Sequence, residues 1–357
     1  MLTFIVPGSI DQVTGGYIFD RRLIQTLRAD GLAVDVVELT GKFPIVDEIA
    51  RTSARATLEL LPDHSLVVID GLALPAFDHA LAANRHRLKV IGFVHHPLVH
   101  ETGLTTAERG QLEIIEVRAW QMLMGIICPS QKCAEAVATL GIARSMIKVA
   151  PPGIQLPPLT VAKSYIKEDG SYPFTSAVKL LTVGSVIPRK GHILLVEALA
   201  ELKDLSWKLD CLGSIESSSE TAYRVRDLIR QKGLEDRIHL HGEVSDKIRD
   251  MAYFNSEIFV LPSFYEGYGM AFAEAMSWGL PIISTTGGAI PETVPPNAGL
   301  LVTPNDQKAL IKALETLIAD KQLRWRMSLA ARKAAQTLPD WPAAGRNWIN
   351  AVEDFAN

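Results

Sequence analysis

Two glutamates eight residues apart are the side chains of this sequence best suited to chemistry. Glu266 lies in the run Glu-Gly-Tyr-Gly, and Glu274 follows in a stretch with a helical pattern. Carboxylates accept hydrogen bonds, and a bidentate acid grips a vicinal diol well. A helix that starts after a glycine loop, expected here over 269–278, offers unpaired N–H groups to an anion. Hydroxyl acceptors beside an anion site predict a ligand such as a nucleotide-sugar.

A basic loop is the second candidate part of this site. Gly184-Ser185 opens the loop and Arg189-Lys190 lies near its end, after a predicted strand at 179–183. Carboxyl ends of parallel strands share one edge of a sheet, so this loop and the Glu266 loop are expected to meet. Arg189 and Lys190 would then neutralise a diphosphate. A solvated basic turn is the alternative interpretation.

Further loops after predicted strands could face the same ligand: Thr14-Gly15-Gly16, His95-His96-Pro97, 242–246 and 287–292. Tandem glycines allow close approach of the backbone, and a histidine can bond a hydroxyl or phosphate or move a proton. A plain helix entry and a structural histidine pair remain the alternatives. Glu101 and Glu113 could serve an acceptor, or they are ordinary surface acids.

Composition restricts the class of protein. The chain has 357 residues, 48% hydrophobic and 21% charged, with a net charge of −4. These values predict two globular domains and no nucleic-acid partner. The three cysteines fit a reducing compartment, the start of the chain lacks a signal-peptide pattern, and no apolar run approaches membrane-spanning length. We therefore expect a cytoplasmic protein.

The elements that must position these side chains alternate along the chain. Short apolar strands followed by helical patterns predict parallel, doubly wound sheets, an α/β fold. Expected strands are 2–7, 33–38, 66–70, 89–94, 125–128, 148–150, 179–183, 208–212, 238–241, 258–261, 281–284 and 300–302. Expected helices are 17–30, 45–61, 105–123, 192–202, 220–232, a short one from Asp246, 269–278 and 306–320, then helical pattern to Asn357 interrupted by Pro339 and Pro342.

A proline-rich stretch divides the chain. Five prolines and two glycines lie within 151–176, a composition typical of a hinge. The predicted organisation is an N-terminal acceptor domain at 1–155, a hinge at 156–176, a donor domain at 177–335 and a C-terminal helix at 336–357. The natural place for a ligand would be a cleft between the domains.

Together these residues resemble glycosyltransferase family 4, most clearly over 184–191 and 262–292. The resemblance implies the GT-B fold: two Rossmann-like domains facing a cleft, with the last helix crossing back to the N-terminal domain. It also implies a retaining transferase that moves a hexose from a UDP- or GDP-linked sugar to an acceptor. The acceptor would be a carbohydrate, a lipid-linked molecule or a small molecule, in glycan, glycolipid or polysaccharide synthesis.

The resemblance also implies roles for individual residues. Glu266 and Glu274 match the family's Glu-x7-Glu motif, at the donor sugar's hydroxyls and at the ribose diol. Lys190 matches a phosphate-binding lysine, and His95 matches a histidine at the donor sugar. Other expected donor contacts are Gly15, Gly16, Gly184, Ser185, Val244, Asp246, Gly267, Tyr268, Gly269 and Met270.

No metal and no cofactor are expected, because no two Asp residues have the i, i+2 spacing of a cation-binding pair. One residue departs from the family pattern: Ser185 stands where an arginine is usual, and Arg189 is a hypothetical substitute. Two alternatives remain: a phosphorylase on the same architecture, and a nucleotide-sugar-binding protein in which Ser185 has removed turnover. The arginines of the first domain form either a face for weak contact with anionic lipid or scattered surface charge.

Overall fold

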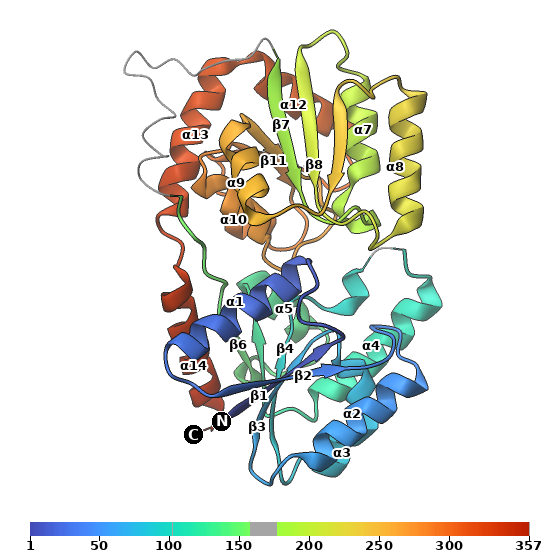
Figure 1. Cartoon of the computed structure of the whole chain (residues 1–357), viewed down its shortest axis with the longest axis vertical. Helices are drawn as coiled ribbons and strands as arrows, with labels where there is room; N and C mark the ends of the chain where they lie inside the picture. The colour runs from blue at the N-terminus through green and yellow to red at the C-terminus, as the bar shows by residue number, and fades with distance from the viewer. Residues whose placement is uncertain (102, 158–176, 357) are drawn as a thin grey trace. The chain divides into compact units, whose positions relative to one another are not determined.

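The computed structural model describes residues 1–101, 103–157 and 177–356, which form two compact units (Figure 1). Unit one comprises Met1–Gln12, Gly16–Gly153 and Pro339–Asn357, and unit two comprises Val13–Gly15 and Ile154–Leu338. Each is built on a sheet of six parallel strands. The predicted α/β fold with two doubly wound parallel sheets is confirmed.

Unit one has the strand order β2-β1-β3-β4-β5-β6. Its strands are β1 (Leu2–Pro7), β2 (Val34–Leu39), β3 (Leu66–Asp70), β4 (Lys89–Phe93), β5 (Gly125–Cys128) and β6 (Ile147–Val149). Its α-helices are α1 (Gly15–Ala29), α2 (Glu48–Leu60), α3 (Asp78–Asn84), α4 (Thr106–Trp120), α5 (Gln131–Thr139) and α14 (Trp341–Ala356), with short 3-10 turns at Leu74–Phe77, Leu98–His100 and Arg144–Met146.

Apolar side chains cover both faces of this sheet, which is why its strands are apolar throughout. One face packs against α2, α3, α4 and α5. On the other face Phe4 lies 6.2 Å from Phe93 and 6.3 Å from Trp348 of α14, and Phe19 of α1 lies 5.0 Å from Phe93, between ring centroids. The last helix therefore belongs to the core of unit one, as predicted.

Unit two has the strand order β12-β11-β10-β7-β8-β9. Its strands are β7 (Val178–Val183), β8 (Trp207–Leu212), β9 (Ile238–Gly242), β10 (Ile258–Val260), β11 (Ile282–Thr285) and β12 (Gly299–Val302). Its helices are α7 (His192–Ala200), α8 (Ser219–Gln231), α9 (Asp246–Asn255), α10 (Met270–Ser277), α11 (Ile290–Thr293), α12 (Gln307–Ala319) and α13 (Lys321–Ala335), with a 3-10 turn at Pro188–Lys190.

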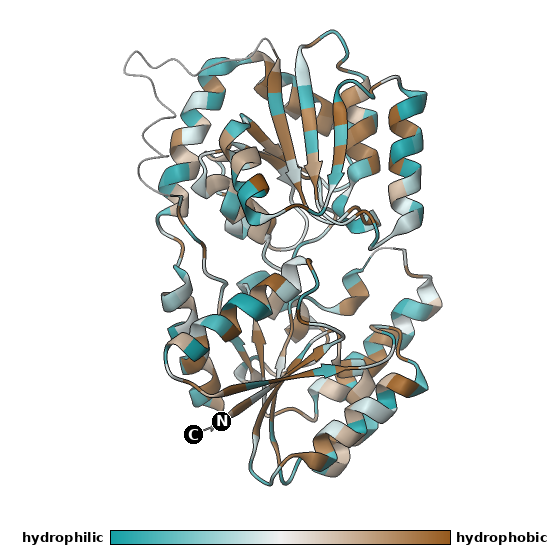
Figure 2. Cartoon of the chain, viewed as in Figure 1, coloured by the Kyte–Doolittle hydropathy of each residue, from teal (hydrophilic) through white to brown (hydrophobic). Residues whose placement is uncertain are grey.

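Alternate residues of these strands serve opposite faces. Leu180 and Ile258 pack with α7, α8 and α12, whereas their neighbours Leu181 and Phe259 pack with α9, α10 and α13. Figure 2 shows the strands mostly apolar and the helices two-sided, as this layering requires. Because β10 and β7 are adjacent, the loops that follow them start side by side.

The structure corrects some predicted elements. Helices α3 and α5 were not predicted, and both are short, so their periodicity is weak. Pro342 does not interrupt a helix: it is the second residue of α14, where its missing N–H costs no intrahelical bond. The predicted hinge 156–176 falls almost wholly on 158–176, which lie outside the described residues. Within the described residues no helix is both long and apolar enough to cross a bilayer.

Candidate functional site

The loops after β7 and β10 contact each other through hydrogen bonds to backbone carbonyls. The amide of Phe264 donates to the Arg189 carbonyl at 2.8 Å, and Arg189 Nη1 donates to the Tyr265 carbonyl at 2.8 Å. Gly191 has a φ of +72°, and a Cβ there would lie 2.3 Å from the Pro262 carbonyl oxygen. Only glycine fits so close to the neighbouring loop, which explains the glycine after Lys190.

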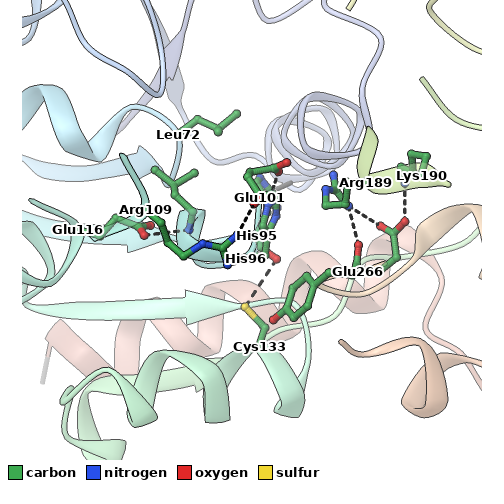
Figure 3. Close-up of polar contacts among 12 residues, drawn as sticks. Leu72, His95, His96, Glu101, Arg109, Glu116, Cys133, Arg189, Lys190 and Glu266 are labelled. Carbon is green, nitrogen blue, oxygen red and sulfur yellow. Dashed lines mark hydrogen bonds and ion pairs between the residues drawn. The ribbon is translucent and has the colours of Figure 1, made fainter. Parts of the chain in front are cut away.

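Both basic side chains of the loop after β7 form ion pairs with Glu266. Lys190 Nζ lies 2.7 Å from Oε1, and Arg189 Nη1 lies 3.3 Å from Oε2 (Figure 3). The Glu266 residue is 6% exposed. Burial by itself would raise the pKa of this carboxyl, but the charges of Lys190 and Arg189 outweigh it and lower the pKa to about 2. Two positive charges and one negative charge leave the cluster at +1, so it still attracts an anion.

This ion cluster predicts a pH dependence of stability. Glu266 has a folded pKa of about 2, below its ordinary 4.5. Its stabilisation is therefore complete above the ordinary pKa and is lost as the pH falls through the folded one. We expect the free energy of unfolding of the wild type to fall between about pH 5 and pH 2, and Glu266→Gln to be flatter there. Urea unfolding at several pH values checks this, and equal slopes would contradict it.

The backbone of Glu266 is held from the other side by the loop after β11. Ala289 N donates to the Glu266 carbonyl at 2.8 Å, and Glu266 forms a β-bridge with Gly288. Gly288 has a φ of +60°, and a Cβ there would lie 2.2 Å from the Glu266 carbonyl oxygen. The loop 287–292 thus acts by placing Glu266.

The N-terminus of α10 follows directly. Gly269 caps it with a φ of +91°, and its carbonyl accepts from Phe272 and Ala273. Helix geometry leaves the amides of residues 269–271 without an intrahelical acceptor. Gly267 is buried, and Tyr268 and Met270 are half-buried. Burial raises the pKa of Tyr268 to about 12, so its hydroxyl is neutral and can donate.

Glu274, in the second turn of α10, is oriented by α9. The hydroxyl of Tyr253 donates to Glu274 Oε2 at 3.2 Å. Tyr253 is fully buried, and burial together with the Glu274 charge raises its pKa well above the ordinary value. The Glu274 charge also acts on Arg249 of α9, whose pKa is raised. Tyr253 therefore helps to fix the rotamer of Glu274, an acid that the sequence pattern had already indicated.

Other predicted donor residues of unit two follow strands β7 and β9. Gly184 lies close to the residue after β8: a Cβ on Gly213 would lie 2.2 Å from the Gly184 carbonyl oxygen. Ser185 is 8% exposed. Val244 is half-buried against the α9–α10 side of the core, and Asp246 is exposed and 2.9 Å from Arg249 Nη1.

In unit one, His95 lies between two carboxylates. Its Nε2 is 3.0 Å from Asp20 Oδ1 and 3.2 Å from Asp70 Oδ2. A Cβ on Gly16 would come within 3.2 Å of the His95 ring, whereas one on Gly15 would meet no described atom within 4 Å. Packing against His95 therefore explains why residue 16 is a glycine, whereas no contact with a described residue explains the glycine at position 15.

Other contacts hold the remaining residues of the loop after β4. His96 Nε2 pairs with Glu101 Oε1 at 2.6 Å (Figure 3). Glu113 is exposed. Glu116, which was not predicted, is 1% exposed and accepts the amide of Leu98 at 2.9 Å. Burial raises its pKa to about 8, and its hydrogen bond to Leu98 helps to order this loop.

Among the described residues, only Asp20, Asp70 and His95 form a group of three that could hold a metal ion. Sequence reasoning missed both acids and Tyr253. Asp70 is the last residue of a predicted strand, and Asp20 lies three residues before Leu23 on the inward face of a predicted helix. Both positions indicated a buried acid, and a buried acid needs a partner.

Comparison with known proteins relates the chain to sugar-transferring enzymes. Residues 169–334 match the family model described as Glycosyl transferases group 1. A curated relative, the MMP alpha-(1->4)-mannosyltransferase of Mycolicibacterium hassiacum, is 24% identical over 74% of this chain and 65% of its own length. The chain thus spans half to two thirds of the length of the curated relatives that it matches first.

Solved structures show the class of fold. The sucrose-phosphate synthase of Thermosynechococcus elongatus has a TM-score of 0.78 at 20% identity, covering 98% of both chains. Anabaena HepE in complex with UDP and glucose has a TM-score of 0.74 at 17% identity, covering 98% of this chain and 99% of its own. The predicted GT-B fold, with its two α/β domains, is confirmed.

Proposed function

We propose that this protein is a glycosyltransferase whose donor is a nucleotide-sugar. The observation that carries the proposal is the cluster of Glu266, Arg189 and Lys190 beside the uncapped amides of α10. It combines hydroxyl acceptors with a net positive anion site in a few residues of unit two. These residues lie within the segment that matches Glycosyl transferases group 1, and HepE, which shares the fold, has been solved with UDP.

The donor would lie along the loops of unit two. Lys190, Arg189 and the amides of 269–271 bind the diphosphate, because charge-assisted donors and a helix N-terminus both favour phosphate. Glu274 accepts from the ribose diol, and Glu266 accepts from hydroxyls of the sugar. Val244 and Asp246 lie near the base, and Gly184 and Ser185 line the phosphates. The proposed contacts of the donor sugar further include His95, Gly15 and Gly16, and these three rest on the resemblance alone.

The chemistry proposed is transfer with retained anomeric configuration and without a metal ion, as in glycosyltransferase family 4 and its Glu-x7-Glu motif. The bond from the anomeric carbon to the diphosphate breaks, and the acceptor hydroxyl bonds to that carbon from the same face. The hydroxyl proton passes to the leaving diphosphate oxygen. Positive charge at Lys190, Arg189 and α10 stabilises the departing diphosphate, which is the largest single effect available here. Glu266 already neutralises part of two cations, so it is not assigned as nucleophile.

Tyr253 gives this proposal a test of its own. Tyr253→Phe removes the hydroxyl that holds Glu274 while keeping the ring that stacks on Trp278 at 6.3 Å. We expect the Kd for the nucleoside diphosphate to rise about tenfold, the equivalent of one hydrogen bond to a charged group. Calorimetric titration measures it. Tyr223→Phe, which changes an exposed tyrosine of α8, is the control and should bind as the wild type does.

Turnover is tested by incubating the protein with UDP-, GDP- and ADP-linked hexoses and with carbohydrate, lipid-linked and small-molecule acceptors. Release of nucleoside diphosphate that depends on an acceptor, with the product anomer determined by NMR, supports a retaining transferase. Ser185 favours one second candidate, a donor-binding protein without turnover, since a neutral residue occupies the position where the family carries arginine. Tight donor binding with no release across the acceptor panel would select that candidate.

A further inference from the structure

Three ionisable side chains meet at the carboxyl end of the unit-one sheet. His95 follows β4, Asp70 ends β3, and Asp20 comes from α1. One nitrogen, His95 Nε2, faces both carboxylates, at 3.0 Å and 3.2 Å. The side chains of Asp20, Asp70 and His95 are 0%, 3% and 15% exposed. The proposed function uses His95 and assigns neither acid.

Several contacts within unit one hold the imidazole ring, and none of them is to its Nδ1. Asp70 Oδ1 accepts the amide of Leu72 at 2.7 Å, which leaves Oδ2 for the histidine. The rings of Phe93 and Phe19 lie 4.6 Å and 5.6 Å from the His95 ring. A Cβ on Gly16 would lie 3.2 Å from the ring's Cδ2, so α1 packs close to this edge of the ring. His95 therefore cannot turn its Nε2 away from the two acids without disturbing this packing.

Charge balance decides the state of the ring. Where both acids are ionised, a lone pair on Nε2 would face two carboxylate oxygens, so Nε2 must carry a hydrogen. Both distances are those of hydrogen bonds. Buried carboxylates also need a nearby positive charge, and the charges that act on Asp20 are those of His95 and Asp70.

The pKa values agree with this balance. Burial tends to lower the pKa of His95, but Asp20 and Asp70 outweigh it and raise the pKa to about 10. Burial raises the pKa of Asp20 to about 7, and its Oδ2 has no partner among the described residues. Tyr17 of α1 faces the same acids; burial raises its pKa and its hydroxyl donates to the Pro7 carbonyl, so it adds no charge. The thiol of Cys133 of α5 donates to the carbonyls of Val94 and His95 at 3.4 Å and 3.6 Å.

We propose that Asp20 and Asp70 are positioning residues that keep His95 as an imidazolium. The Nε2–H is shared between the two carboxylates, and the Nδ1–H stays as a charged donor for a phosphate or hydroxyl oxygen of the ligand. The ligand class rests on the proposed function, whereas the protonation of His95 does not. Without the two acids, a histidine with its ordinary pKa of about 6.5 would be mostly neutral at physiological pH.

The direct test is the protonation of His95 in the ligand-free full chain. Nitrogen NMR of protein labelled at histidine distinguishes an imidazolium from either neutral tautomer, and His95→Asn identifies the signal. At pH 8.5 the wild type is expected to show both His95 nitrogens protonated. A neutral His95 at this pH would overturn the proposal, whatever the protein binds.

Two variants separate positioning from mere folding. Asp70→Asn and Asp20→Asn keep the side-chain volume and remove one charge each, and either should lower the titration midpoint of His95 by at least about one unit, a tenfold loss of proton affinity. Asp35→Asn, at an exposed site of β2, should leave it unchanged. A folded variant with an unchanged midpoint contradicts the proposal, and the wild-type measurement decides alone if neither variant folds.

A cation is the competing occupant of this cluster. The three ligand atoms lie within 4.8 Å of one another, so Zn²⁺ or Mn²⁺ could replace the shared proton. If EDTA changes the His95 signal of the purified protein, or if one equivalent of Zn²⁺ shifts it, the site holds a metal and the proton assignment is wrong. Binding of UDP is measured separately, so its absence would count against the proposed function and leave the protonation result standing.

Discussion

Replacing Lys190 with methionine is expected to lower kcat/KM for the donor by about 100- to 1000-fold, the usual cost of one charge-stabilising donor. Lys190 Nζ lies 2.7 Å from Glu266 Oε1, and the Lys190 side chain is 16% exposed. The variant loses a cation at the proposed diphosphate and half of the charge that compensates Glu266. The pKa of Glu266 should then rise, because Arg189 alone remains to offset its burial. Steady-state kinetics with the donor identified by binding measures the effect.

Matched variants make this result specific. Lys190→Arg keeps the charge and should recover part of the rate, and Lys308→Met, at an exposed site of α12, should behave as the wild type. Arg189→Ala tests whether Arg189 replaces the arginine missing at Ser185, and it should cost far more turnover than Arg226→Ala at an exposed site of α8. If the turnover of Arg189→Ala equals that of Arg226→Ala, Arg189 does not replace the arginine missing at Ser185.

Gly288→Ala is expected to be among the most damaging single-methyl additions in unit two. A Cβ there would lie 2.2 Å from the Glu266 carbonyl oxygen, and the backbone has a φ of +60°. The Glu266 backbone would have to move, which would also open its ion pairs. We expect a loss of about 1–3 kcal/mol beyond the strain of the left-handed backbone, and weaker donor binding.

Gly233 provides a nearly ideal control. Its φ is +61°, but a Cβ would meet no described atom within 4 Å. Gly233→Ala should therefore lower the free energy of unfolding only by the left-handed strain, about 1–2 kcal/mol. Its donor affinity should be unchanged. Chemical unfolding and donor titration of both variants isolate the contact with Glu266. Equal losses of stability and affinity would mean that the loop after β11 does not place Glu266.

Much of the fold could be predicted because apolar strands and helical patterns alternate so regularly. The order of strands could not, since it depends on which way each crossover turns. That order brings β7 beside β10, so it decides that Arg189 and Lys190 reach Glu266. The sequence indicated that the loops meet, but not that the cations and the acid would pair with each other.

The buried acids of unit one were missed for a local reason. Helical periodicity alone places Ile18, Leu23, Ile24 and Leu27 on the inward face of the first helix. The structure leaves Ile18 half-buried and buries Tyr17, Phe19 and Asp20 instead. The buried face keeps Leu23, Ile24 and Leu27 but extends further toward the start of the helix, where it includes Asp20, a partner of His95. Long-range pairs of this kind depend on packing that no local pattern specifies.

Whether a nucleoside diphosphate binds is the measurement that tests the central claim most directly. Thermal unfolding of the purified protein with UDP, GDP or ADP, each with and without EDTA, needs no knowledge of the acceptor. A ligand at 100-fold its Kd should stabilise the protein by roughly 2.7 kcal/mol. The account predicts a rise in Tm with at least one diphosphate, unchanged by EDTA and absent in Glu274→Ala but present in Glu235→Ala, at an exposed site. No rise with any of the three would contradict the nucleotide-sugar donor, and a rise abolished by EDTA would contradict the metal-free mechanism.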